Sequence, residues 1–159
     1  MKARVQIRTM AAADLAQVLA IAKNLPEAPH WPQSTYLKAI DPNSSPRRIA
    51  LVILGSDAES GLQPILGFAI ASLLAPQAEI ETIAVAGECQ RQGLGRQLLQ
   101  ALIANLIALS VNEVFLEVRS SNYSAIAFYW SFGFIQTGLR PGYYTDPVDH
   151  AVLMRLPLA

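Results

Sequence analysis

Residues 90–96 read Gln-Arg-Gln-Gly-Leu-Gly-Arg and lie between a strand-like stretch, 78–85, and a long apolar helical stretch that begins at Gly93. Two glycines two residues apart let backbone amides approach a ligand closely. The start of a helix directs free N–H groups and a partial positive charge to the same place. Because Arg91 and Arg96 add charge, the segment predicts a site for an anion such as a pyrophosphate. Alternatively, the glycines only give the helix start its flexibility.

This segment is neither of two common phosphate loops. No Gly-Lys-Ser/Thr follows, which excludes a Walker loop, and the third glycine of the dinucleotide fingerprint is missing. The helix that begins at Gly93 runs to about Ser110, and 114–118 predicts a strand. The strand, helix and next strand therefore form one crossover unit, which we expect to be parallel and right-handed.

The flanking regions add further elements. Before the crossover unit, the pattern predicts a strand at 5–10, a helix through Leu15 and Ala22, a proline-rich loop at 24–32, a short helix capped by Ser34, and strands at 48–54 and 65–74. After it, Asn122 can cap a helix that ends at Gly133. Two closing strands, 134–139 and 151–156, then surround a tyrosine-rich loop.

Composition limits the possible classes. The chain has 159 residues, 52% of them apolar, and we expect 1–159 to form a single domain. Twelve basic residues balance twelve acidic ones, so no net field favours nucleic acid or an anionic membrane as a partner. Cys89 cannot form an internal disulfide, and together with His30 and His150 it lacks metal-ligand spacing. We therefore expect no metal and a cytoplasmic location.

Two segments resemble targeting or membrane signals. The basic, alanine-rich N-terminal stretch is interrupted by Asp14 and Gln17, which favours a strand and an amphipathic helix over a signal peptide. The apolar run 98–111 is too short to span a membrane and contains polar residues, so a buried helix is expected.

The order of short motifs resembles the GNAT superfamily of N-acetyltransferases. The motifs are Ile83-Ala84-Val85, the 90–96 segment, Leu116-Glu117-Val118-Arg119 with Ser121-Asn122, Tyr129, and Gly133-Phe134. Within the superfamily, the Leu-Glu-Val-Arg-x-Ser-Asn run, the helix with Tyr129, the 140–144 segment and Trp31 resemble the bacterial ribosomal-protein alanine N-acetyltransferases. The resemblance extends from about residue 5 to 156. Gly87 and His150 depart from it, at positions where a proline and an aspartate are common.

The resemblance implies a fold and a cosubstrate. The fold would be a GNAT-type α/β (α+β) arrangement, with a mixed, mostly antiparallel sheet of six to seven strands, a central parallel strand-helix-strand unit and helices on both faces. The cosubstrate would be acetyl-CoA. Its pantetheine arm would pair with the backbone of Ile83, Ala84 and Val85, and Asn122 would also contact it. Its pyrophosphate would bind the pocket made by Arg91, Gln92, Gly93, Leu94, Gly95 and Arg96.

Acetyl transfer to an amine needs a deprotonated amine, a stabilised oxyanion and a proton for the departing thiolate. The resemblance assigns Glu117 as the general base; an ion pair with Arg119 is the structural alternative. Tyr129 could act as general acid, or could simply be a core aromatic. Glu79 and Glu81 are rival bases, expected on the face opposite Thr82.

The acceptor is expected to be the N-terminal amine of a protein or peptide, such as a ribosomal protein. Such a terminus would enter between Trp31 and the 140–144 segment, where Arg140, Tyr143 and Tyr144 could flank it and Glu79 or Glu81 could accept its hydrogen bonds. A small-molecule amine acetyltransferase and a non-catalytic acyl-CoA-binding module are the alternatives. We expect a monomer or a weak homodimer.

Overall fold

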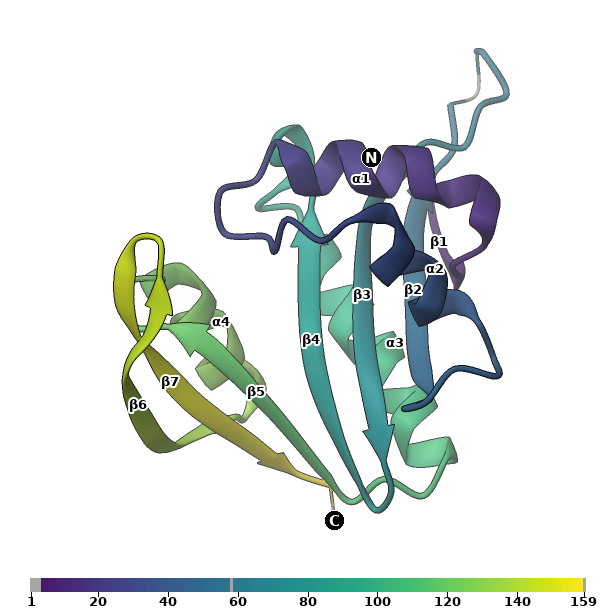
Figure 1. The fold of residues 1–159 in the computed structure, drawn as a ribbon. Coiled ribbons are helices and arrows are strands. Elements are labelled where there is room, and N and C mark those ends of the chain that lie inside the picture. Colours follow the sequence, from purple (N-terminus) through teal and green to yellow (C-terminus); the bar gives the residue numbers. More distant parts are fainter. Residues whose placement is uncertain (1–3, 58, 159) are drawn as a thin grey trace.

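The structure is a computed structural model that describes residues 4–57 and 59–158. Within that part, seven strands form one sheet in the order β1-β2-β3-β4-β5-β7-β6 (Figure 1). The strands are β1 (Val5–Thr9), β2 (Arg48–Gly55), β3 (Ile65–Leu74), β4 (Gln77–Val85), β5 (Glu113–Arg119), β6 (Ile135–Thr145) and β7 (Val148–Pro157). Neighbouring strands are antiparallel except for β4 and β5. The predicted mixed, mostly antiparallel sheet is confirmed.

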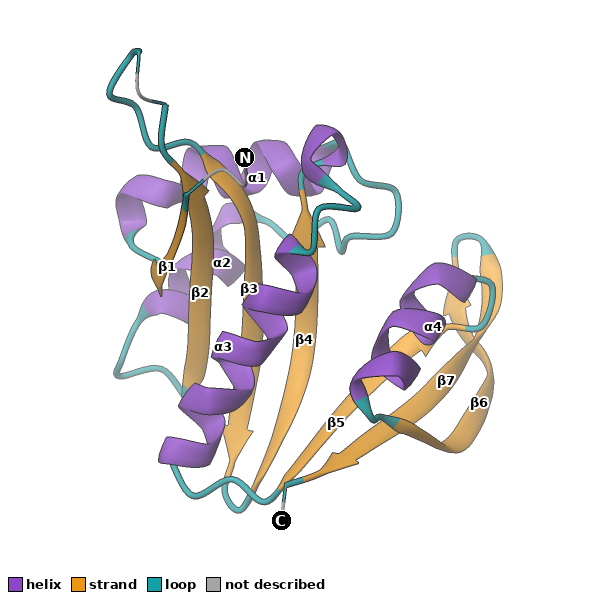
Figure 2. Ribbon diagram, turned by 180° about the vertical axis from the view of Figure 1, so that it is seen from behind, coloured by secondary structure: helices purple, strands orange, loops and turns teal. Residues whose placement is uncertain are grey.

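Helices cover both faces of the sheet. Helices α1 (Leu15–Lys23) and α2 (Gln33–Ile40) lie on one face of β2, β3 and β4, whereas α3 (Leu94–Ala108) lies on the other and α4 (Tyr123–Phe132) packs behind β5 and β7 (Figures 1 and 2). Each face has its own buried core. One core contains Leu98, Leu99 and Leu102 of α3, and the other contains Val18 and Tyr36 of the first two helices.

The parallel strands β4 and β5 separate soon after they meet. Their pairing covers only residues 77–79 of β4 and 113–115 of β5. Beyond this point they diverge, so that the sheet opens like a V between the β1–β4 half and the β5–β7 half (Figure 2). The later residues of β4 consequently have a free backbone edge toward β5.

A β-bulge interrupts β4 at Glu81. In the β3–β4 register, Ile70 lies opposite Thr82, but the next residue, Ala71, lies opposite Ile80. Glu81 is therefore an extra residue on the bulged strand. Such a bulge reverses the alternation of side chains along the strand.

The bulge places both glutamates of β4 on the face of Thr82. Ile70 and Ser72 lie on the same face of β3, because they are two residues apart. Ile70 lies opposite Thr82, whereas Ser72 lies opposite Glu79 in β4 and opposite Arg48 in β2. Glu79 and Arg48 therefore share the face of Thr82. Nε of Arg48 donates a hydrogen bond to Oε1 of Glu81 at 2.8 Å on that same face. The prediction that Glu79 and Glu81 face away from Thr82 is therefore wrong, because simple alternation does not hold across a bulge.

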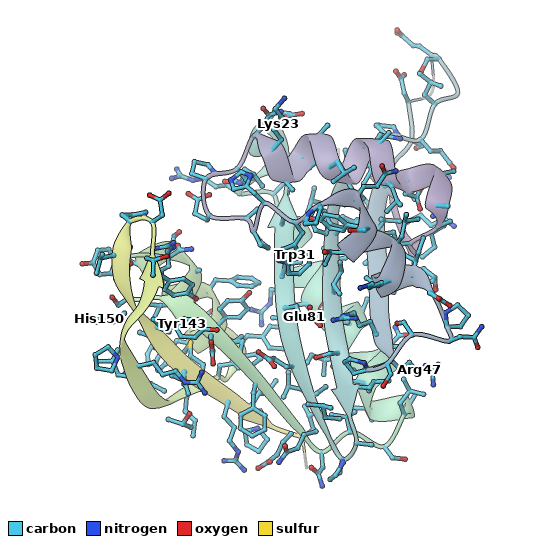
Figure 3. The ribbon with its side chains drawn as sticks, in the orientation of Figure 1. Lys23, Trp31, Arg47, Glu81, Tyr143 and His150 are labelled. Carbon is cyan, nitrogen blue, oxygen red and sulfur yellow. The ribbon has the colours of Figure 1, made fainter. Side chains whose placement is uncertain are left out.

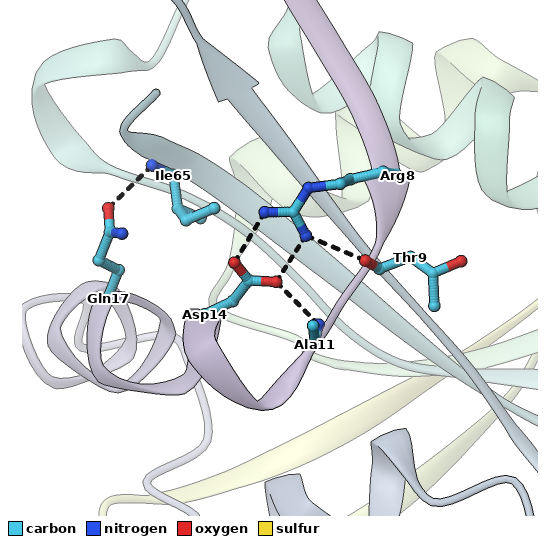
Figure 4. Close-up of polar contacts among 6 residues, drawn as sticks. All are labelled: Arg8, Thr9, Ala11, Asp14, Gln17 and Ile65. Atoms are coloured by element: carbon cyan, nitrogen blue, oxygen red, sulfur yellow. Dashed lines mark hydrogen bonds and ion pairs between the residues drawn. The ribbon is translucent and has the colours of Figure 1, made fainter. Parts of the chain in front are cut away.

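A buried carboxylate fixes the connection between β1 and α1. Arg8 donates two hydrogen bonds to Asp14, at 2.7 and 2.8 Å, and the N–H of Ala11 donates to the same carboxylate at 2.7 Å (Figure 4). Oε1 of Gln17 then accepts from the N–H of Ile65 at 2.9 Å, which ties α1 to the start of β3. These contacts hold α1 over the sheet.

Two local predictions are wrong. Helix α2 begins at Gln33 with Pro32 as its N-cap, so Ser34 lies inside the helix and does not cap it. The tyrosine-rich segment is not a loop: β6 continues to Thr145 and β7 begins at Val148. Pairing between these two strands is what orders the segment. In the described part of the chain, no helix has both the length and the apolar character needed to cross a membrane.

Candidate active site

The segment before α3 presents free backbone N–H groups. Gly93 is the N-cap residue with a φ of +80°, and Arg91 also has a positive φ, +64°. The N–H groups of residues 92–96 donate to no acceptor in the part of the chain that the structure describes. The buried side chain of Leu94 fixes the helix start on the core. Consecutive free donors thus lie at the positive end of the helix dipole, an arrangement that suits an anion.

The same segment contacts both sides of the V-shaped opening. A Cβ atom at Gly95 would lie 3.8 Å from the side chain of Val85 in β4 and 3.8 Å from the ring of Phe128 in α4. The guanidinium of Arg96 lies 5.1 Å from the centre of the Phe132 ring. The donors before α3 therefore lie between β4 and α4, on the two sides of the opening.

The free edge of β4 offers further backbone groups. The N–H of Ala86 donates to the carbonyl of Leu66 in β3 at 2.8 Å. Because backbone polar groups alternate in direction along a strand, those of Ala84 also point toward β3. Those of Ile83 and Val85 consequently point toward the opening, where a ligand with amide groups could pair with them.

Helix α4 carries two of the predicted site residues. Oδ1 of Asn122 accepts the N–H of Ala125 at 3.2 Å, so the predicted N-cap is confirmed. Tyr129 is 9% exposed and packs between the rings of Phe128 and Phe134, at centroid distances of 5.2 and 5.5 Å. Burial raises the pKa of the Tyr129 phenol well above its ordinary value, so the phenol keeps its proton at neutral pH.

Glu117 lies on the opposite face of β5 from α4. Its neighbours Leu116 and Val118 belong to the core under α3 and α4, and alternation turns the carboxylate between them to the other face. Oε1 of Glu117 lies 3.3 Å from Nη1 of Arg140. The side chain of Glu117 is about one-fifth exposed and so can be reached from the face that carries α1 and α2.

Arg119 is not the ionic partner of Glu117. Its Nη1 donates to the carbonyl of Pro147 at 2.9 Å, and its guanidinium stacks 4.2 Å from the centre of the Tyr144 ring. Arg119 thus holds the β6–β7 hairpin against the end of β5. Arg140, and not Arg119, is the ionic partner of Glu117.

Three carboxylates approach one another across the opening. Burial, and then the nearby charges of Glu117 and Glu81, raise the pKa of Glu79. Glu81 is neutralised by its ion pair with Arg48, whose Nε lies 2.8 Å from it. Arg140 pairs with Glu117 in the same way, so the cluster on the α1–α2 side keeps one net negative charge, at Glu79, which can attract a cationic group.

The two adjacent tyrosines of β6 border this surface. The rings of Tyr143 and Tyr144 meet edge to face at 5.1 Å, and Arg140 lies 5.5 Å from the centre of the Tyr143 ring. The charge of Glu117 raises the pKa of Tyr143, whose residue is 49% exposed. Tyr143 is thus a neutral, accessible phenol beside the carboxylate.

Trp31 lies across the opening from these tyrosines. Figure 3 shows Trp31 and Glu81 in front of β3 and β4, and Tyr143 on the branch made by β5, β6 and β7. The indole packs against Tyr36 at 5.4 Å and borders a hollow of about 190 Å³ between α1 and the following loop, lined by Leu19, Ala22, Lys23, His30 and Trp31.

The structure therefore brings the predicted residues together in two groups. One group lies on the α3 side of the opening and contains the segment 90–96, the edge 83–85 and α4. The other group lies on the α1–α2 side and contains Glu79, Glu81, Glu117 and the 140–144 segment. Sequence reasoning missed Arg48 and Phe128. The only signal for Arg48 was a charge at the start of an apolar strand. No group of His, Cys, Asp or Glu side chains in residues 4–57 and 59–158 is arranged to hold a metal ion.

Known proteins resemble this chain in sequence and in fold. Residues 15–134 match the acetyltransferase (GNAT) family. The [ribosomal protein bS18]-alanine N-acetyltransferase of Escherichia coli K12 is 45% identical over 94 residues, which are 58% of this chain. The matched stretch spans 64% of the length of that enzyme, slightly less than two thirds.

Solved structures extend the likeness to nearly the whole chain. The ribosomal-protein-S18-alanine N-acetyltransferase from Escherichia coli has a TM-score of 0.81 and 32% identity, covering 98% of this chain and 95% of that chain. Chaetomium thermophilum Naa20, solved with a bisubstrate analogue, has a TM-score of 0.79 and 26% identity, covering 96% and 86%. Because the family match covers most of the sequence and the fold agrees throughout, this chain belongs to the acetyltransferase (GNAT) family.

Proposed function

We propose that this chain transfers the acetyl group of acetyl-CoA to the N-terminal α-amine of a protein, and that the acceptor is a ribosomal protein met in the cytoplasm. The observation that carries the proposal is the opening between β4 and β5. Free amide donors lie on its α3 side, and the Glu117 carboxylate lies on its α1–α2 side. A cosubstrate and an acceptor could thus approach the same point from opposite faces.

The donor side fits acetyl-CoA. The amides of residues 92–96, with Arg91 and Arg96, would bind the pyrophosphate, and the backbone of Ile83 and Val85 would pair with the pantetheine amides. Asn122 at the start of α4 would border the same arm. When bound, acetyl-CoA would supply the acetyl group as a thioester at the opening.

Glu117 would remove the proton from the acceptor amine, directly or through a water molecule. Its carboxylate is partly exposed and lies beside the opening. The amine nitrogen would then bond to the acetyl carbon as the carbon–sulfur bond breaks. The second proton, left on the new amide nitrogen, would be lost to solvent, from which Tyr129 regains the proton that it gives to the sulfur. Glu79, whose pKa is raised, is the second carboxylate that could share this role.

Tyr129 would return a proton to the departing sulfur. A general acid must hold its proton at the working pH, and burial raises the pKa of this phenol. The neighbouring Phe128 contacts the segment that would bind the pyrophosphate, which supports placing Tyr129 beside the cosubstrate.

The acceptor side suits an extended peptide. Tyr143, Tyr144, Arg140 and Trp31 border an open surface, whereas a small amine would call for a deeper pocket. The similarity to the S18-alanine N-acetyltransferase supports a protein terminus over a free amine. Glu79 would attract the cationic terminus before it loses its proton, whereas Glu81 is already paired with Arg48.

Acetyl transfer to a panel of short peptides and free amines, followed by mass spectrometry, tests the proposal. The expected result is one acetyl group on the N-terminus of peptides that begin with alanine. Preferential modification of polyamines or free amino acids would favour a small-molecule acetyltransferase. Binding of acetyl-CoA without transfer to any amine would favour a non-catalytic module.

A further inference from the structure

A second bulge, in β6, is opposed by a single residue of β7. Arg140 lies opposite Ala151 and Tyr144 lies opposite Asp149, so residues 141–143 all face His150. Within this bulge Gly142 has a φ of +62°, a left-handed conformation that favours glycine. The regular ladder of backbone hydrogen bonds is therefore interrupted beside His150.

The His150 side chain replaces the missing ladder contact. Its Nδ1 accepts the N–H of Gly142 at 2.9 Å. This bond requires a lone pair on Nδ1, so the ring proton must lie on Nε2. The backbone of His150 is itself fixed, because its carbonyl accepts the N–H of Ser120 at 2.9 Å and its N–H donates to Asp149 at 2.8 Å. The imidazole thus holds the bulge from a rigid support.

The bulge separates two residues that meet at the candidate base. Arg140 precedes it and Tyr143 ends it, and both lie beside Glu117. The conformation of residues 141–143 therefore sets how the guanidinium and the phenol are placed around the carboxylate. A change at Gly142 would be transmitted to the acceptor side of the opening.

We propose that His150 is a positioning residue: its neutral imidazole holds the β6 bulge in the form that binds the acceptor, and protonation of the ring releases it. An imidazolium ion has no lone pair on Nδ1 and repels the Gly142 N–H. The link to acceptor binding rests on the proposed function, whereas the link between His150 and the bulge does not. The acceptor should therefore bind more weakly as the pH falls.

The charged groups on the neighbouring elements do not provide this switch. Hydrogen bonds from Ser120 and Ser121 lower the pKa of Asp149, which stays ionised. Burial raises the pKa of Tyr144, and the charge of Glu117 raises that of Tyr143, so both phenols stay neutral. Arg119 stacks on the Tyr144 ring, and Arg140 pairs with Glu117. Imidazole is the side chain suited to change its charge between pH 5 and 8.

A matched pair of variants tests the role. Asparagine places an oxygen close to the position of Nδ1 and does not titrate, whereas glutamine places its amide one bond further out. His150→Asn should keep the parent KM for an acceptor peptide at pH 8, and His150→Gln should raise it about three- to tenfold, the effect of one hydrogen bond. In both variants kcat and acetyl-CoA affinity should stay close to the parent values.

The pH profile separates His150 from the titrating acceptor amine. The acceptor amine becomes protonated to the same extent in assays of the parent and of His150→Asn. The ratio of the two KM values therefore reports only the effect of protonating the imidazole. The KM of the parent divided by the KM of His150→Asn should rise about three- to tenfold as the pH falls from 8 to 5.5. A constant ratio, or equal behaviour of the asparagine and glutamine variants, overturns the positioning role.

Nuclear magnetic resonance of the parent protein gives a readout that needs no activity. The Gly142 amide proton should shift and exchange faster as His150 titrates, and the imidazole nitrogens should show the proton on Nε2 at pH 8. If the chemical shift and exchange rate of the Gly142 amide proton do not change with pH, or if the imidazole proton lies on Nδ1 at pH 8, the inference is overturned. The proposed function is unaffected by either result. Failure of acetyl transfer to every peptide would instead overturn the proposed function, and this measurement would still decide whether His150 holds the bulge.

Discussion

Arg140 reaches across β7 to place its Nη1 3.3 Å from Oε1 of Glu117. The small Ala151 lies opposite both Arg140 and Arg119 in the ladders and leaves room for this crossing. Because the guanidinium side chain is 56% exposed, solvent screens the ion pair, which is worth no more than about 1 kcal/mol. An incoming acceptor can therefore displace Arg140 from the carboxylate at little cost.

Glu117→Gln should lower kcat at pH 7 by about 10²- to 10⁴-fold, the usual contribution of a general base. Only acceptor molecules already neutral in solution could then react, so the activity of the variant should rise steeply with pH. Glu113→Gln is the matched control, because Glu113 lies on the same strand and face and is also ion-paired, to Arg155, but at the closed end of the opening. Its kcat should stay near the parent value.

If Glu117→Gln kept the parent kcat with chemistry shown to be rate-limiting, the base would have to be Glu79 or Glu81. The separate variants Glu79→Gln and Glu81→Gln would then be measured. Glu79 would be the stronger candidate, because Glu81 is held by Arg48.

Tyr129→Phe should reduce kcat while leaving acetyl-CoA affinity unchanged, because a group that protonates the departing sulfur acts on the transition state. Tyr36→Phe is the control. Tyr36 is fully buried and its hydroxyl has no partner among the described residues, so removing that hydroxyl should stabilise the fold by about 1 kcal/mol. Stopped-flow rates measure the effect on catalysis, and thermal unfolding measures the effect on stability. An unchanged rate in Tyr129→Phe would mean that Tyr129 is a core aromatic and not the general acid.

Gly93→Val and Gly95→Val should each weaken acetyl-CoA binding in isothermal titration. At Gly93 the φ of +80° strains any side chain, whereas at Gly95 a valine would enlarge the contact with Val85 and Phe128, which a bare Cβ meets at 3.8 Å. Gly87→Ala is the control, because a Cβ at this exposed position meets nothing within 4 Å. Parent-like affinity in a folded Gly93→Val or Gly95→Val protein would contradict the loop assignment.

The helices and most strands can be predicted because their signals are local. The apolar face of α3, the cap at Asn122 and the glycine after α4 all lie within one element. The bulge at Glu81 cannot be predicted, because residues 79–82 alternate regularly in sequence and only the pairing with β3 shows the extra residue. The tyrosine-rich segment reads as a loop for the same reason: β7 supplies the pairing that makes it a strand.

The candidate site divides in the same way. The free donors at residues 92–96 follow from a local glycine pattern. The partners of the carboxylates do not, because Arg48 reaches Glu81 and Arg140 reaches Glu117 from strands distant in sequence. Sequence proximity favours Arg119 as the partner of Glu117, but the hairpin carbonyls and the Tyr144 ring hold Arg119 elsewhere.

Asp14→Asn should lower the free energy of unfolding at pH 7 by about 2 kcal/mol, because it removes a charged acceptor of hydrogen bonds from Arg8 and Ala11. The hydrogen bond from Arg8 lowers the pKa of Asp14 in the folded state. A lowered folded pKa contributes stability that is fully present above the unfolded value, about 3.9, and is lost as the pH falls through the folded pKa.

Urea unfolding at pH 7 and below pH 3 checks this dependence. The difference between the parent and Asp14→Asn should shrink as the pH falls, because the parent carboxylate becomes protonated. Glu27→Gln, at an exposed site, should change stability by less than about 0.5 kcal/mol at either pH. A difference that stayed constant with pH would mean that the cost of Asp14→Asn comes from packing rather than from charge.

The last prediction is that the acceptor is an α-amine rather than a lysine side chain. An α-amine has a pKa of about 7.7–8.0, against about 10.4 for lysine. A much larger fraction of the α-amine is therefore already neutral at pH 7, and a weak carboxylate base is enough to deprotonate the rest. Tyr143 and Trp31 border the opening and can flank an extended chain, which would position the terminus beside the thioester. Glu79→Gln should raise the KM of a peptide more than its kcat changes, because it removes attraction for the cationic terminus.

Two peptides decide the matter. One begins with a free alanine and contains a lysine, and the other has the same sequence with its N-terminus blocked. The free peptide should gain one acetyl group at its terminus, located by fragmentation in the mass spectrometer, and the blocked peptide should react at least about 100-fold more slowly. That expectation follows from the difference in pKa, since a gap of more than two units makes neutral lysine over 100 times scarcer at pH 7. Faster acetylation of the blocked peptide would mean that the carboxylates around Glu117 serve a lysine acceptor, and the assignment to a protein terminus would be wrong.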